Sequence, residues 1–238
     1  METITDKLVL TNVFTEIRFS PSPLFSDLKL LTGYMNSLRS SFDSVRYEEQ
    51  AKQIICNTVD GKKNVNVSST RFVVEFSDPS NYDEFISVSE SIITGYTSIF
   101  EVNQFERAGI RYSMPAKFDT FEEAKKLFFD KFLHALRSVQ IPEDLFSGLN
   151  SGKVELYYTV RDRKLNISIL PIKMQFVEIK IGPIGQETSV QKTIDGLMFD
   201  MDYFHEGRVT LPQFISQLKS GIGIVKAKAT TLLKALGV

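Results

Sequence analysis

The chain has 238 residues, 42% of them hydrophobic, with 28 basic and 29 acidic side chains. That length buries a sizeable core without help from a metal, and a single cysteine, Cys56, excludes the disulfide framework of a small secreted protein. A formal net charge of −1 removes the electrostatic argument for a strongly basic nucleic-acid binder.

The sequence shows no targeting or membrane-spanning segment. Its first residues lack the basic start and apolar stretch of a signal peptide, and no run approaches the roughly 18 apolar residues of a membrane span. We therefore expect a cytoplasmic protein with no transmembrane segment.

The first part of the chain predicts the order β-α-β-β-β-α. Apolar residues alternate with polar ones in the expected strands, whereas they recur every three or four residues in the expected helices. Asp60-Gly61 is a hairpin-turn signal, and Ser80 with Asp83 forms a candidate capping box. The expected strands cover residues 8–19, 51–58, 65–67 and 71–76, and the expected helices cover 24–38 and 80–100.

The second part begins with the same order and continues with more strands, as β-α-β-β-β-β-α. Thr120 and Glu123 form a second candidate capping box ahead of an apolar helical stripe. The expected strands cover residues 107–113, 152–161, 164–170, 175–181 and 197–203, and the expected helices cover 120–136 and the stretch from Leu211 onward.

Two short matches indicate an internal duplication. EIRFS at 16–20 aligns with GIRYS at 109–113, with a helix following each at a similar distance, and FIS at 85–87 matches FIS at 214–216. The prediction is an α+β protein of two units, 1–103 and 104–238, whose antiparallel sheets join edge to edge with helices on one face. The alternative is one α+β domain whose strands are alike only in composition.

Two resemblances follow from these landmarks. In element order the second unit resembles the TATA-box-binding-protein-like and helix-grip folds, which constrains architecture alone. The segments EIRF (16–19), RAGIRY (107–112) and FDMD (199–202) resemble those of a patchily distributed, uncharacterised bacterial family of about this length. That resemblance implies a bacterial cytoplasmic protein carried with multi-component, defence-related loci, and it brings no known catalytic residue.

An acidic cluster with one histidine lies near the end of the last expected strand. Asp200 and Asp202 project from one side of that strand, with His205 and Glu206 just beyond it. Such oxygen and imidazole donors suit a divalent metal. The alternative is an acidic solvent-facing strand whose carboxylates pair with Arg18 and Arg111.

Arginines form the second group of candidates. Arg18 and Arg111 occupy matching positions in the two proposed units, where their guanidiniums could hold a phosphate or a carboxylate. The alternative is ion pairing with nearby acids. By alternation, Arg71, Arg111, Tyr157 and Arg161 also point outward and are candidates for nucleic-acid binding on the open sheet.

The last helix is both apolar and basic. Lys219, Lys226 and Lys234 follow one stripe beside an apolar one, a pattern that can dock a partner groove or an anionic membrane. The alternative is a core helix with a solvated face. Gly221 and Gly223 inside it indicate close packing or a bend.

These observations predict a non-catalytic binding or assembly module whose partner is another protein. No set of general acid, base and nucleophile emerges at a readable spacing, and no cofactor is expected. The first alternative is a metal-dependent phosphoester hydrolase that uses Asp200, Asp202 and His205, with an arginine holding the substrate. The second is nucleic-acid binding on the sheet face.

Overall fold

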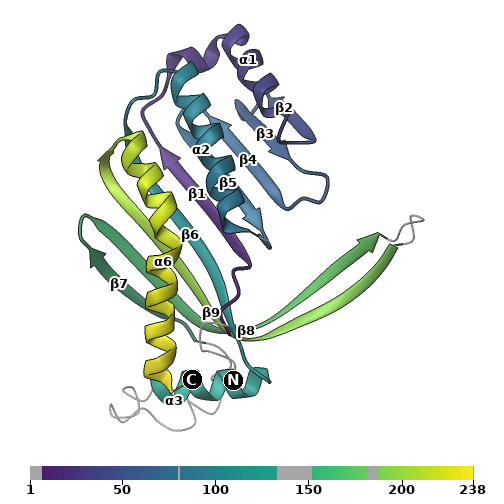
Figure 1. Cartoon of the computed structure of the whole chain (residues 1–238), viewed down its shortest axis with the longest axis vertical. Helices are drawn as coiled ribbons and strands as arrows, with labels where there is room; N and C mark the ends of the chain where they lie inside the picture. Colours follow the sequence, from purple (N-terminus) through teal and green to yellow (C-terminus); the bar gives the residue numbers. More distant parts are fainter. Residues whose placement is uncertain (1–6, 80, 133–151, 182–186, 238) are drawn as a thin grey trace.

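The chain forms one continuous nine-stranded antiparallel sheet with helices packed against one of its faces (Figure 1). A computed structural model describes residues 7–79, 81–132, 152–181 and 187–237. Along the sheet the strands follow the order β2-β3-β4-β5-β1-β6-β9-β8-β7. The predicted α+β class, with an antiparallel sheet and helices on one face, is therefore confirmed.

The strands differ greatly in length. Their bounds are β1 Asn12–Arg18, β2 Ser44–Glu48, β3 Gln53–Asn57, β4 Lys63–Ser68, β5 Arg71–Ser77, β6 Phe105–Lys117, β7 Val154–Val160, β8 Arg163–Ile181 and β9 Glu187–Val209. Among the described residues the helices are the short 3-10 helix η2 Pro23–Ser26 and the α-helices α1 Leu28–Leu38, α2 Tyr82–Ile99, α3 Phe121–Phe132 and α6 Leu211–Leu236.

Local side chains explain where the helices begin. The Asp27 carboxylate accepts hydrogen bonds from the backbone amides of Lys29 and Leu30 at the start of α1. Asn81 caps α2 in the same way, whereas Ser80 of the predicted capping box lies outside the described residues. Thr120 accepts the Glu123 amide at the start of α3, as its predicted box requires.

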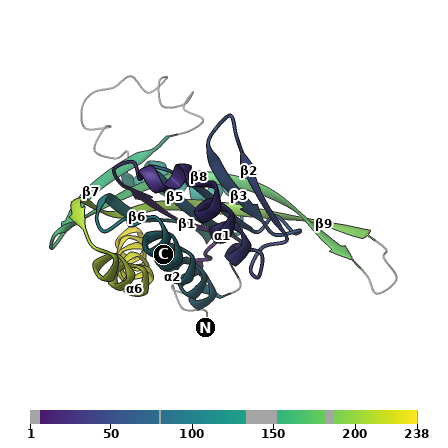
Figure 2. The same ribbon diagram turned by 90° about the horizontal axis from the view of Figure 1, so that it is seen from above.

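The core lies between the sheet and helices α1, α2 and α6, which share one face (Figure 2). Tyr96 of α2 lies at the centre of the first half of this core. Its ring centre is within 6.2 Å of the centres of five other aromatic rings. In the second half, Phe105 meets Phe214 of α6 edge-on at 6.2 Å. Most phenylalanines of the described residues thus fill one long core.

Two predictions about the number of strands were wrong. The polar stretch from Ser40 to Gln50 contains β2, an edge strand in which only Val45 and Tyr47 face the core. The two strands predicted at 164–170 and 175–181 are one strand, β8, which continues through Pro171. Proline is tolerated there because β7 pairs with β8 only as far as Ile169, which leaves Pro171 at a sheet edge.

As a result, the two units differ from the predicted orders. Four strands follow α1, where three were expected, and three follow α3 in the described part of the chain, where four were expected. The segments EIRFS and GIRYS begin on the neighbouring central strands β1 and β6, and they meet at Glu16 opposite Gly109, from which they run in opposite directions. Duplication itself, and the boundary near residue 103, stay predictions.

The outer parts of β8 and β9 form a two-stranded ribbon that extends away from the body of the protein (Figure 1). Its pairing runs from Lys173 opposite Asp195 to Ile181 opposite Glu187. An isolated two-stranded ribbon is marginally stable in water, so the ribbon depends on the body for its order and not the reverse.

Removing the ribbon is therefore expected to leave the body stable. Replacing residues 175–193 by an Asn-Gly turn between Met174 and Ile194, which face each other, should shift the melting temperature by less than about 3 °C in calorimetry. Leu197→Ala, at the buried base of the ribbon, is the control that should lower it clearly. A fall of more than about 8 °C on truncation would show that the ribbon supports the core.

Gly221 and Gly223 of α6 differ in their surroundings. A Cβ atom on Gly221 would lie 2.3 Å from the Tyr112 hydroxyl oxygen, which is fixed by its 2.8 Å hydrogen bond with the Tyr82 hydroxyl. A Cβ atom on Gly223 would meet no atom within 4 Å. The prediction of close packing is thus confirmed for Gly221 alone.

The same alanine substitution is expected to have opposite effects at these two positions. Gly221→Ala should lower the free energy of unfolding by about 2–3 kcal/mol through overpacking. Gly223→Ala should raise it by about 0.5–1 kcal/mol through helix propensity. Urea denaturation measures both, and adding Tyr112→Phe to Gly221→Ala should recover part of the loss because the clashing oxygen is gone. Equal effects at the two positions would contradict the packing.

Candidate functional site

The candidate site lies on the face of the sheet opposite the helices. Alternate residues of the central strands are buried beneath the helices, so their neighbours point to the other face. Helices α1, α2 and α6 leave that face open. Its charged and aromatic side chains, from β5 across to β7, are Arg71, Glu75, Phe14, Glu16, Arg18, Arg107, Arg111, Asp200, Asp202, Phe204, Glu206, Lys164, Glu155 and Tyr157.

Three arginines stand side by side on neighbouring strands, and we call them the arginine row: Arg71 of β5, Arg18 of β1 and Arg107 of β6. Arg18 is directly opposite both of the others in the strand register. Like charges in such positions repel each other unless an acid lies between them. Glu16 provides that acid, with a side chain only 7% exposed.

All three guanidiniums bind the Glu16 carboxylate. Nε of Arg71 lies 2.6 Å from Oε1 of Glu16, Nη1 of Arg107 lies 2.8 Å from Oε2, and Nη2 of Arg18 lies 3.1 Å from Oε2. One buried carboxylate therefore neutralises three cations only in part. Arg18 and Arg71, each 57% exposed, keep further N–H donors in solvent.

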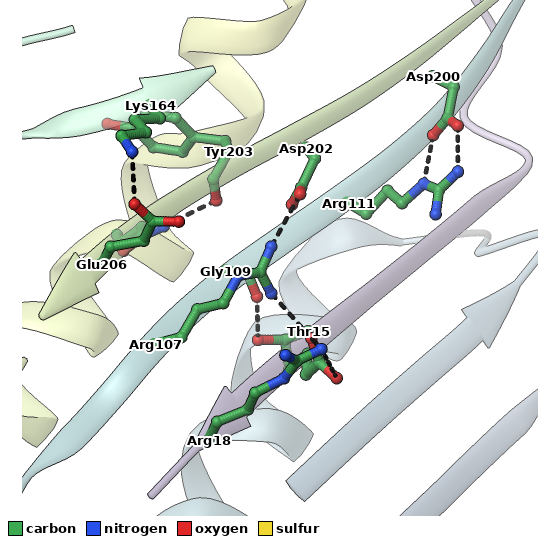
Figure 3. A network of polar contacts seen from close by, with 12 residues as sticks. Thr15, Arg18, Arg107, Gly109, Arg111, Lys164, Asp200, Asp202, Tyr203 and Glu206 are labelled. Atoms are coloured by element: carbon green, nitrogen blue, oxygen red, sulfur yellow. Dashed lines mark hydrogen bonds and ion pairs between the residues drawn. The ribbon is translucent and has the colours of Figure 1, made fainter. Parts of the chain in front are cut away.

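Arg107 bridges two acids beside Gly109 (Figure 3). Arg107 lies over the Phe204 ring, 4.6 Å from its centre, its Nη2 donates to Asp202 at 2.8 Å, and its Nη1 donates to Glu16 at 2.8 Å. A Cβ atom on residue 109 would lie 2.8 Å from Cβ of Phe204, which is too close. The missing side chain thus lets Phe204 pack against β6, and Phe204 in turn supports the Arg107 guanidinium.

Arg111 forms a separate pair. Its guanidinium holds both carboxylate oxygens of Asp200, with Nε at 2.6 Å from Oδ1 (Figure 3). The same guanidinium lies over the Phe14 ring. The hydrogen bond to Asp200 raises the pKa of Arg111. Burial raises the pKa of Asp202 above its usual value, although Arg107 and Arg111 oppose that shift.

Arg18 and Arg111 were predicted at equivalent points of two repeats. Both point to the open face, at positions that are symmetric about the Glu16–Gly109 pair in the strand register. Their surroundings differ, however, since Arg18 binds Glu16 of its own strand and Arg111 binds Asp200 of β9. The structure thus shows the ion pairs of the alternative interpretation.

The residues proposed as metal ligands each have another partner. Asp200 and Asp202 bind Arg111 and Arg107, and Nε2 of His205 lies 3.6 Å from Asp162 in the turn between β7 and β8. In the described parts of the chain no group of three His, Cys, Asp or Glu residues is placed to hold a metal. The metal-site hypothesis stays a prediction that gains no geometric support here.

The candidates for nucleic-acid binding do not form one cluster. Tyr157 is 70% exposed on the edge strand β7, where its hydroxyl donates to Glu155, whereas Arg71 is five strands away on β5. At about 4.8 Å per strand that separation is about 24 Å. Arg161 lies in the β7–β8 turn with φ of 60°, so its predicted place in a strand was wrong.

The basic helix α6 is part of the core. Its apolar stripe packs against the sheet, with Phe214, Leu218 and Val225 fully buried, so that stripe is not free to enter a partner groove. Lys219 pairs with Glu90 of α2 at 3.0 Å. Lys226 and Lys234 are exposed on the outer side of the helix.

Sequence reasoning missed the main feature of this face, the convergence on Glu16. It identified Arg18 and Arg71 separately and gave Arg107 no role. The alternation of Glu16 and Arg18 on one strand signalled the outward face, but the adjacency of β5, β1 and β6 depends on strand order, which alternation does not encode.

Comparisons with known proteins show little beyond this geometry. The sequence matches no family profile and no curated protein. Among solved structures it is similar to Methanococcus jannaschii TBP, with 10% identity, a TM-score of 0.32, and coverage of 82% of this chain and 86% of that one. A likeness of that size carries no inference about ligand or activity. None of the described helices is long and apolar enough to span a membrane.

Proposed function

We propose that this protein is a non-catalytic binding module that docks another protein on the open face of its sheet. The observation that carries the proposal is the arginine row, in which three cations share one buried carboxylate and two of them remain half exposed. A sheet that presents N–H donors which bind no other group of the protein is suited to the recognition of a partner.

The surroundings of the row support recognition of a protein. Phe14 and Tyr157 add aromatic area to the same face, and arginine and tyrosine are enriched at protein interfaces. Acidic side chains, among them Asp200 and Glu206, alternate with the basic ones along the central strands. That mixture disfavours a nucleic-acid backbone, which requires a continuous basic track.

Photo-crosslinking in cells tests this function. A benzophenone amino acid is placed at Tyr157 or Asn66, both exposed on the open face, and at Lys226 on the helix face as the matched control. We expect the open-face positions alone to yield a discrete protein adduct, whose identity mass spectrometry establishes and whose binding is then measured with purified components. Adducts from Lys226 only, or adducts with nucleic acid, would overturn the proposal.

A further inference from the structure

We propose that Arg18 and Arg71 form a carboxylate-binding site, and that the segment docked on the open face is an acidic stretch of the partner protein. This inference rests on the proposed function and specifies the chemistry of its partner. It starts from the local charge of the row, where three guanidiniums face Glu16 and, within the described part of the chain, only Arg107 has a second acid, Asp202.

The geometry leaves donors available. Arg18 uses Nη2 and Arg71 uses Nε to bind Glu16, while each guanidinium carries five N–H groups. Both side chains are more than half exposed, so the unused N–H groups reach solvent. Because Glu16 is buried beneath the two guanidiniums, it orients them without covering the side that faces solvent.

The identity of the anion follows from the neighbours of the row. Glu206, bound to Lys164, lies opposite Arg107 on β9, and Glu106 accepts a hydrogen bond from Ser20 at 2.6 Å just beyond the end of β1. These acids limit the cationic patch to the width of a few strands. Glutamate side chains on a peptide are flexible, so one planar carboxylate can enter between these acids while the others turn away from them. A phosphodiester chain instead carries a fixed charge at every nucleotide and would hold some of those charges against the acids.

The test uses fluorescence anisotropy with the full chain and three labelled probes: a 12-residue peptide rich in glutamate, the same peptide with glutamine in place of glutamate, and a short single-stranded DNA. We expect the acidic peptide alone to bind. Arg18→Gln with Arg71→Gln should weaken that binding by about tenfold or more. The matched control is Lys226→Gln with Lys234→Gln, which removes the same charge from the helix face and should change nothing.

A second variant separates charge from shape. Arg18→Lys with Arg71→Lys keeps both charges and loses the planar forks, so it should bind the acidic peptide more weakly than the wild type but more tightly than the glutamine variant. Thermal melts of all variants establish that they fold.

Three outcomes would overturn the inference. The first is an equal loss of peptide binding in the Arg18→Gln/Arg71→Gln variant and the Lys226→Gln/Lys234→Gln control. The others are equal binding of both peptides, or tighter binding of DNA than of the acidic peptide. A protein adduct from the open face together with any of these would leave the proposed function standing and remove only the carboxylate site. Absence of the adduct would remove the function itself.

Discussion

The protein is expected to unfold steeply as the pH rises above about 10, because its buried phenol and thiol groups ionise more readily in the unfolded chain than in the folded one. Four tyrosines, Tyr34, Tyr82, Tyr96 and Tyr112, have pKa values raised above 10.0, mainly by burial. Burial also raises the pKa of Cys56 to about 12. All five side chains face the core between sheet and helices.

The sign of the effect follows from proton binding. In the unfolded chain these groups lose their protons near the ordinary values, 10.0 for tyrosine and 9.0 for cysteine, while the folded protein retains them. The unfolded state therefore binds fewer protons, and the free energy of unfolding falls as the pH rises. This stabilisation is complete below pH 9, and each group contributes a slope of about 1.4 kcal/mol per pH unit once its unfolded pKa is passed.

Urea denaturation at a series of pH values, with tyrosinate absorbance followed in parallel, measures this dependence. We expect the absorbance of the buried tyrosines to appear together with unfolding. Tyr96→Phe should reduce the slope by about one proton. Tyr157→Phe, at a 70% exposed position where the hydrogen bond to Glu155 and not burial is the main cause that raises the pKa, should reduce it less. A smooth titration of every tyrosine in a folded protein would contradict the burial of these groups.

The same buried side chains show why much of the fold could be read from the sequence. Phe72, Val74 and Phe76 alternate on β5, and Ala108, Ile110 and Tyr112 alternate on β6, so the core face of each strand was predictable. The hydrophobic period and the capping residues are local signals, because each involves residues only a few positions apart in the sequence. Element type, and the presence of helices on one face, follow from that local information.

The features of the fold that could not be predicted from the sequence depend on contacts between distant segments. β2 has too few apolar residues to stand out, and the continuity of β8 through Pro171 depends on where β7 ends beside it. The site shows the same limit, because Glu16 meets Arg107 across 91 residues of sequence. A charge pattern along one strand shows which face is exposed but not which strand lies next to it.

Replacement of Glu16 by alanine is the sharpest test of that distant pairing. The change leaves Arg18 opposite both Arg71 and Arg107 with no carboxylate between them, and it empties a position that is 7% exposed. We expect the free energy of unfolding in urea to fall by about 3 kcal/mol, the lower end for a broken buried ion pair, because Arg18 and Arg71 remain partly solvated.

Two further measurements separate lost charge from lost packing. If repulsion dominates, adding Arg18→Ala to Glu16→Ala should restore part of the stability, and 1 M salt, which shortens the screening length to about 3 Å, should reduce the loss. Glu155→Ala, on the solvent-facing side of β7, should leave the urea midpoint unchanged. A loss that neither salt nor the second substitution reduces would mean that Glu16 acts by filling space, and the arginine row would then lack the charge imbalance on which its proposed ligand depends.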